Sequence, residues 1–208
     1  MNKVVRHIVV IITGASGSVY GLRLIDELLR SSQTVSVLIS NAGRQVMAYE
    51  VGLTLDTSPA RAAEQIRAYL QVDGDLQCYA NDNFFAPVAS GTSAPDATVI
   101  VPCSMGTAGR IAAGLSESLI ERVADVALKE RRELLLVPRE SPFNQIHLEN
   151  MLRLSQAGAH ILPAMPGFYH HPETIDDLVD FVVGKILDSL NIEHTLFPRW
   201  GAGANQED

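Results

Sequence analysis

The stretch HIVVIITGASG, residues 7–17, decides which fold this chain is expected to adopt. Six residues rich in Val and Ile stop at a short glycine-containing segment, and apolar residues then recur at helical spacing from Val19 to Leu29. This pattern predicts a buried strand, a tight loop and a helix. A second β-rich run, Thr34–Ser40, follows at once, and another helical pattern begins at Val46. The opening is therefore predicted to be a βαβα unit with parallel strands.

The alternation of strand and helix patterns continues along the chain. Residues 73–95 are the one long stretch with weak periodicity, and we expect there a mobile active-site segment or a short strand followed by a loop. The whole pattern predicts an α/β fold, Rossmann-like (flavodoxin-like), with a parallel sheet and helices on both faces. We expect a single domain over residues 1–200 and a disordered tail at 201–208. Further strands are predicted at Ala97–Pro102, Leu134–Pro138 and His160–Pro163, and further helices around Leu115–Glu130, Gln145–Gln156 and Thr174–Leu190.

Composition narrows the class of protein. With 208 residues, of which 47% are hydrophobic and 19% charged, the chain can bury one substantial core without disulfides or metals. No apolar run reaches about 18 residues and no secretory signal is evident, so we expect a cytoplasmic protein with no membrane contact. The net charge of −8 disfavours nucleic acid as a partner. Cys78 and Cys103 are predicted to be reduced thiols, and the six histidines lack a metal-binding spacing, so no metal is assigned.

Two segments place small polar residues between a strand and a helix: TGASG at 13–17 and PCSMGT at 102–107. Backbone N–H groups, a hydroxyl and a helix dipole can bind a phosphate there, although an ordinary turn or cap explains each segment alone about as well. The glycine spacing is neither the dinucleotide fingerprint nor a P-loop. Ser40 also stands where a nicotinamide site would want an acidic residue. Two such loops at one sheet edge favour a mononucleotide such as FMN over NAD.

Charged and aromatic residues near the predicted ligand edge can be interpreted in more than one way. Arg139 and Glu140 follow directly after a predicted strand and so belong at that edge. Lys129 lies at a predicted helix end, where the default interpretation is a solvated side chain that compensates the helix dipole. Phe168 and Tyr169 follow a predicted turn and could form a core plug, or a lid whose tyrosine hydroxyl reaches a phosphate.

Several longer runs resemble one known family, the UbiX/Pad-type flavin prenyltransferases. They are TGASG at 13–17, ERVADVALKER at 121–131, VPRE at 137–140, IHLENML at 146–152, MPGFYH at 165–170 and PRW at 198–200. The resemblance implies a flavoprotein that binds FMN at a subunit interface of a homododecamer. It implies that dimethylallyl monophosphate is joined to N5 and C6 of reduced FMN without a metal ion. The prenylated FMN would then serve a partner UbiD-type decarboxylase.

The resemblance also implies a role for individual residues. FMN contacts are implied for Gly14, Ala15, Ser16, Ser40, Ser104, Met105, Gly106, Thr107 and Arg139, and substrate contacts for Arg122, Lys129, Arg139, Tyr169 and Lys185. The implied catalytic residues are Ser16, Glu50, Lys129 and Glu140, with Glu140 giving or taking a proton and Ser16 relaying it. Two positions depart from the family pattern. Lys185 stands where Arg is commoner, which loses bidentate geometry, and Phe84 stands where some relatives have Trp.

Three other functions are open to a chain of this kind. An FMN-dependent cysteine decarboxylase is the main alternative, but its chemistry needs no pocket of four cations for a phosphate. A nonenzymatic flavin-binding subunit would not need Ser16, Lys129, Glu140 and Tyr169 together. A decarboxylase acting directly on aromatic acids would need a second carboxylate-binding cluster, which the sequence does not show.

Overall fold

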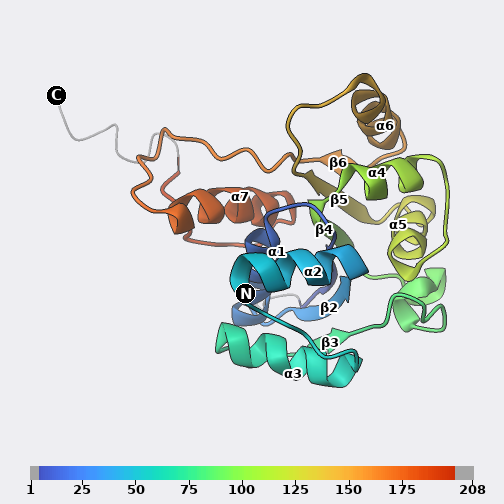
Figure 1. Cartoon of the computed structure of the whole chain (residues 1–208), viewed down its shortest axis with the longest axis horizontal. Helices are drawn as coiled ribbons and strands as arrows, with labels where there is room; N and C mark the ends of the chain where they lie inside the picture. Colours follow the sequence, from blue (N-terminus) through green and yellow to red (C-terminus); the bar gives the residue numbers. More distant parts are fainter. Residues whose placement is uncertain (1–4, 200–208) are drawn as a thin grey trace.

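The computed structural model describes residues 5–199, in which six parallel strands form one sheet in the order β3-β2-β1-β4-β5-β6 (Figure 1). Neighbouring strands pair in parallel, with His7 opposite Thr34 and Ile8 opposite Ala97. The strand order reverses at β1 and β4, and this is where parallel α/β sheets bind ligands. The strands are β1 (His7–Ile12), β2 (Thr34–Ile39), β3 (Leu76–Cys78), β4 (Ala97–Cys103), β5 (Glu133–Pro138) and β6 (His160–Ile161).

Helices cover both faces of the sheet because successive strand residues point to opposite sides. Ile8, Val10 and Ile12 pack in a core with α1 and α7, whereas Val9 and Ile11 pack in a second core with α4 and α5. Both faces are buried, which is why the strands read as continuous apolar runs. The helices are α1 (Ser18–Arg30), α2 (Asn41–Val51), α3 (Pro59–Leu70), α4 (Met105–Ala112), α5 (Leu119–Lys129), α6 (Gln145–Gln156) and α7 (Ile175–Ser189).

The predicted fold class is confirmed, and the differences are local. Helix α5 begins four residues later than Leu115, because Ser118 and Glu121 form a capping box that starts it at Leu119. The pattern did not predict α3, whose buried side is small. The weakly periodic stretch contains β3 and two short 3₁₀ turns, so it is a short strand followed by a loop. The tail expected at 201–208 lies outside the described residues.

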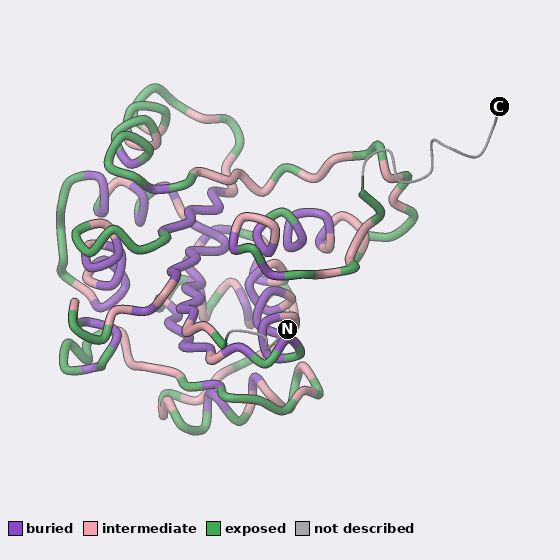
Figure 2. Tube along the Cα trace, turned by 180° about the vertical axis from the view of Figure 1, so that it is seen from behind, coloured by how far each residue is buried: buried purple, intermediate pink, exposed green. Residues whose placement is uncertain are grey.

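The part of the chain after β5 leaves much apolar surface exposed. Figure 1 shows the segment between β6 and α7 running out past the side of the sheet before α7 returns. Figure 2 shows that α6 and this segment are largely exposed or half-buried. In α6 only Leu154 is buried, while Ile146, Leu148 and Leu152 are exposed, and Phe168 is exposed on the projecting segment. Surfaces of this kind are typical of contacts between subunits.

No helix within residues 5–199 is long and apolar enough to cross a membrane.

Candidate active site

The first part of the site is the loop between β1 and α1. Gly14 lies against the first turn of α2, and a Cβ added to it would come within 2.5 Å of the Ala42 Cβ. Gly17 has a φ of 109°, a left-handed conformation that favours glycine. The loop therefore needs both glycines to reach its position at the carboxyl edge of the sheet.

Two serine hydroxyls cap helices that start at the same edge. Ser40 Oγ accepts a hydrogen bond from the backbone N–H of Gly43 at 3.0 Å at the start of α2. Ser104 Oγ accepts one from the N–H of Thr107 at 3.3 Å at the start of α4. The N-terminal ends of α1, α2 and α4 thus open on one edge, where their dipoles favour an anion. The predicted FMN residues around Ser16, Ser40 and Ser104 share this edge.

Glu50, near the end of α2, holds the β1–α1 loop from the side. Its carboxylate accepts hydrogen bonds from the N–H groups of Gly17 and Ser18 at 3.0 Å and from Ser18 Oγ at 2.6 Å. Partial burial raises the pKa of Glu50, but hydrogen bonds from Ser16, Ser18 and the loop backbone outweigh that effect and hold the pKa below its ordinary value. Glu50 is therefore an ionised acceptor at neutral pH, and not a proton donor.

Arg139 closes the other side of this loop. Its Nε donates to the carbonyl oxygen of Ser16 at 3.0 Å, and within residues 5–199 no carboxylate lies within 4.0 Å of its guanidinium. Arg139 lines an open hollow of about 480 Å³ together with Gly14, Ser16 and Glu50. Glu140, the next residue, is half-buried and accepts a hydrogen bond from the N–H of Ser141 at 3.0 Å. This edge thus holds a cation that is available to an anionic ligand.

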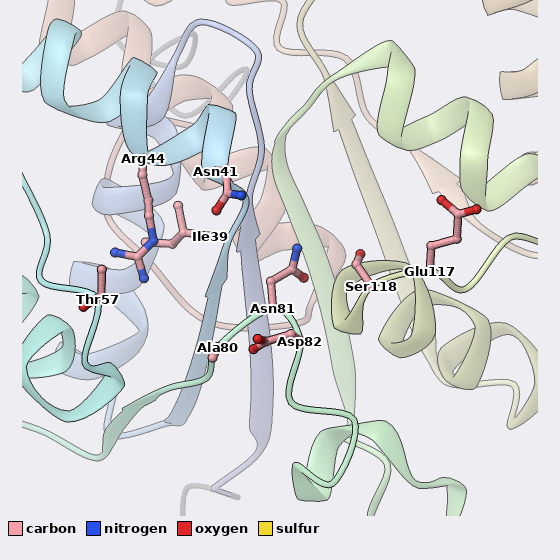
Figure 3. A pocket seen from close by; sticks show the side chains of 9 residues that line it. All are labelled: Ile39, Asn41, Arg44, Thr57, Ala80, Asn81, Asp82, Glu117 and Ser118. Carbon is pink, nitrogen blue, oxygen red and sulfur yellow. The ribbon is translucent and has the colours of Figure 1, made fainter.

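A second hollow, of about 400 Å³, lies on the other side of the α2 N-terminus. Figure 3 shows the side chains of Asn41, Arg44 and Asn81 around it, from α2 and from the segment after β3. Ile39 and Asn41, the two neighbours of Ser40, both line it. The sequence pattern did not predict this group of residues, and the one signal for it was that Asn41 follows Ser40 at a strand end. Among residues 5–199, this hollow is lined by Ile39, Asn41, Arg44, Thr57, Ala80, Asn81, Asp82, Glu117 and Ser118.

Two of the predicted phosphate-binding residues lie on α5, Arg122 in its first turn, next to the carboxyl edge, and Lys129 at its far end. Arg122 donates to the carbonyl oxygen of Ala89 at 3.2 Å and pairs with Asp125 at 3.1 Å. Lys129, at the other end of the helix, pairs with Glu130 at 2.5 Å. From Leu119 to Lys129, α5 rises about 15 Å.

Lys129 and Glu140 of one protomer lie at opposite edges of the sheet. The chain passes from Lys129 through a short turn into β5, and Glu140 follows the far end of that strand. Five strand steps separate the first and last residues of β5 by about 17 Å. This span is longer than a lysine side chain, so the two residues of one protomer cannot contact the same phosphate.

Tyr169 and Lys185 form a third group on the projecting segment and α7. The Tyr169 ring packs edge-on against Phe181, with 5.6 Å between ring centroids. Lys185 follows Phe181 by one helical turn, and its Nζ lies 3.7 Å from a carboxylate oxygen of Asp188. The predicted substrate residues therefore occupy three separate parts of the protomer, and the structure does not bring them together within one chain.

The sequence of this chain is similar to those of known proteins. A family model described as Flavoprotein matches residues 1–187. The chain is 52% identical over 196 residues to flavin prenyltransferase UbiX of Pseudomonas aeruginosa, a match that covers 94% of each protein. The chain belongs to the UbiX family of flavin prenyltransferases. The resemblance seen in the sequence is thereby confirmed, and so is the expectation of a transferase.

Solved structures of UbiX proteins share the fold closely. The structure of AnUbiX (PadA1) in complex with FMN and dimethylallyl pyrophosphate superposes with a TM-score of 0.85 at 37% identity, covering 95% of this chain and 98% of that one. A dodecameric FMN-dependent UbiX-like decarboxylase from Escherichia coli O157:H7 superposes with a TM-score of 0.82 at 37% identity, covering 93% and 98%. The cypemycin decarboxylase CypD, at 16% identity and a TM-score of 0.57, shares the fold alone. UbiX membership therefore favours prenyl transfer over cysteine decarboxylation.

Proposed function

We propose that this chain joins the dimethylallyl group of dimethylallyl monophosphate to N5 and C6 of reduced FMN without a metal ion. The observation that carries the proposal is the match to UbiX flavin prenyltransferases over 94% of the chain. The geometry supports it, because Arg139 stands beside a glycine loop and no carboxylate of the described residues lies within 4.0 Å of its guanidinium.

The carboxyl edge of the sheet fits FMN. A Cβ at Gly14 would close the gap between the loop and α2, and Gly106 leaves the start of α4 exposed. Ser16, Ser40, Ser104 and Arg139 would hold the cofactor with side chains or backbone N–H groups. Ala15, Met105 and Thr107 are buried, so they would contribute through backbone groups. When bound, reduced FMN supplies the nucleophilic ring that accepts the prenyl group.

The residues of this chain would stabilise the departing phosphate and move the proton. Breaking the allylic C–O bond leaves negative charge on the phosphate and positive charge on carbon. Arg122, Lys129, Arg139 and Lys185 would bind that phosphate and do what Mg²⁺ does in other prenyl transfers. Glu140, placed next to Arg139 in the chain, would give or take a proton, with Ser16 relaying it. Phe84, half-exposed, could stabilise the cationic carbon with its ring face.

Charge balance makes the metal unnecessary in this scheme. Arg122, Lys129, Arg139 and Lys185 carry four formal positive charges, and Glu140 carries one negative charge. In one protomer Asp125, Glu130 and Asp188 pair with three of these cations, so the scheme requires those three ion pairs to open toward the phosphate in the assembled site. An alkyl monophosphate adds about −2 near neutral pH, by analogy with phosphorylated side chains. Within residues 5–199 no group of three or more His, Cys, Asp or Glu residues is arranged to hold a metal ion.

The assembled enzyme is proposed to be a homododecamer whose sites are completed by neighbouring copies. The exposed apolar faces of α6 and of the projecting segment support this, as does the dodecamer of the E. coli relative. We propose a cytoplasmic location because Cys78 and Cys103 are both free thiols, which persist in reducing compartments. Delivery of prenylated FMN to a UbiD-type decarboxylase is proposed from the resemblance alone.

Anaerobic incubation with reduced FMN and dimethylallyl monophosphate, followed by mass analysis of the flavin, tests the proposed reaction. The flavin should gain one dimethylallyl group, and the gain should persist in EDTA. An unchanged flavin, or activity that EDTA abolishes and Mg²⁺ restores, would contradict the proposal.

Two variants separate the proposed roles. Glu140→Gln should still bind FMN and the prenyl phosphate but turn over about 10²–10⁴-fold more slowly, since it loses proton transfer. Lys129→Ala should lose phosphate affinity as well as rate, because a charge is missing in both the ground state and the transition state.

A further inference from the structure

An ion pair with a buried carboxylate connects the first turn of α5 to α4. Glu121 is 3% exposed, and its carboxylate accepts hydrogen bonds from the N–H groups of Glu117 and Ser118, both at 2.9 Å. Its other oxygen accepts from Arg110 Nε. Arg110 in turn donates through Nη2 to Thr107 Oγ1 at 3.2 Å. Glu121 therefore holds a guanidinium directly behind the capping turn of α4.

The hydroxyl groups of Thr107 and Ser104 lie 3.1 Å apart in that turn, so one of them donates to the other. Thr107 is 2% exposed, and Ser104 Oγ is the one acceptor that the structure shows for its O–H within residues 5–199. If Ser104 donated instead, the Thr107 proton would be buried without an acceptor, which is costly. Thr107 is therefore the donor. Ser104 Oγ then accepts twice, from the N–H and the O–H of Thr107.

This leaves the O–H of Ser104 free to donate outward, at the carboxyl edge of the sheet. Arg110 favours this arrangement. Its guanidinium can only donate, so the Thr107 hydroxyl accepts from it, and a hydroxyl that accepts from a cation becomes a better hydrogen-bond donor. The chain of donors runs from Arg110 to Thr107 to Ser104 and ends on a half-buried hydroxyl.

We infer that Arg110, held by Glu121, is a positioning residue that makes Ser104 a hydrogen-bond donor to an acceptor atom of FMN. The inference rests on the proposed function, in which Ser104 contacts the cofactor. Arg110 acts through Thr107 and need not touch FMN itself. The acceptor is a phosphate oxygen or a ring carbonyl oxygen, and both have the same chemistry toward an O–H donor.

The test is a double-mutant cycle on FMN binding by the apoprotein, followed by flavin fluorescence. Arg110→Gln should weaken FMN binding by about three- to tenfold, the effect of one hydrogen bond. Ser104→Ala should weaken it by a similar factor. In the Ser104→Ala background, Arg110→Gln should have no further effect. If the two losses multiply instead, Arg110 acts independently of Ser104 and the inference is wrong.

Thr107→Val interrupts the same chain of hydrogen bonds at its middle residue, because it removes the hydroxyl and keeps the shape of the side chain. It should weaken FMN binding as Arg110→Gln does, and Arg110→Gln should add nothing to it. This variant keeps the inference testable if Arg110→Gln fails to fold. Unchanged FMN affinity in a folded Thr107→Val protein would overturn the inference.

The matched control is Arg23→Gln, which removes another partly exposed arginine that pairs with Asp26, Glu27 and Asp180 away from this edge. It should lower the melting temperature and leave FMN affinity unchanged. Riboflavin, which lacks the phosphate, identifies the acceptor. If Arg110→Gln weakens riboflavin binding by the same factor, the acceptor is a ring carbonyl, and if it weakens only FMN binding, the acceptor is the phosphate. A wild-type protein that binds FMN but forms no prenylated flavin would contradict the proposed function and leave this inference standing.

Discussion

Mixing two variants that are each slow alone shows whether Lys129 and Glu140 act from different subunits. In one protomer these residues lie at opposite edges of the sheet, separated by the length of β5, about 17 Å. If they serve one site, that site must join Lys129 of one copy to Glu140 of another. Lys129→Ala and Glu140→Gln chains, co-expressed in equal amounts with different tags, would then assemble some sites in which both residues are intact.

The expected recovery follows from random assembly. A site is intact when the copy that supplies Lys129 carries only Glu140→Gln and the copy that supplies Glu140 carries only Lys129→Ala. Each condition holds for half of the chains, so about one quarter of the sites should be intact in a symmetric oligomer. Turnover of the purified hybrid, measured as prenylated flavin formed per site, should therefore approach a quarter of the wild-type rate, although each variant alone is slow.

A matched mixture distinguishes the two arrangements further. Wild-type chains mixed equally with a Lys129→Ala/Glu140→Gln double variant should also give about one quarter of the wild-type rate if the site is shared between copies, but about one half if each copy is self-contained. No recovery in the first mixture together with half activity in the second would refute the shared site.

Three further outcomes follow from the described contacts. Burial raises the pKa of Cys103 to about 12 and that of Cys78 to about 12, so a thiol reagent at pH 8 should label neither in the native protein and both in denaturant. The lowered pKa of Glu50 means that it contributes stability above its ordinary pKa of 4.5, and this is lost as the pH falls through the lower folded value. Melting temperatures in acid should therefore fall more steeply for the wild type than for Glu50→Gln. Gly14→Val should weaken FMN binding, since its Cβ would approach that of Ala42 to 2.5 Å and force the loop from α2; unchanged affinity would show that the loop can move without cost.

The sequence by itself determined the fold and the edge at which the site lies. Parallel strands buried on both faces must be continuous apolar runs, and β1, β2 and β4 were visible for that reason. Short polar segments after two of these strands located the carboxyl edge. Local signals explain most of the remaining boundaries, including the cap that starts α5. Helix α3 was not predicted from the sequence because its apolar side is small.

Only the tertiary structure decided which of the candidate residues meet. Glu50 holds the N–H of Gly17 across 33 positions of sequence, and Arg110 reaches Glu121 from a different helix. Such contacts depend on how the helices pack on the sheet, and the hydrophobic periodicity of the sequence does not predict that packing. The resemblance implied that Lys129 and Glu140 belong to one site, but a sequence motif does not give the distance between two residues in space. Because β5 runs from one edge of the sheet to the other between Lys129 and Glu140, the fold places these residues far apart in one copy, and a site that used both would need a second copy.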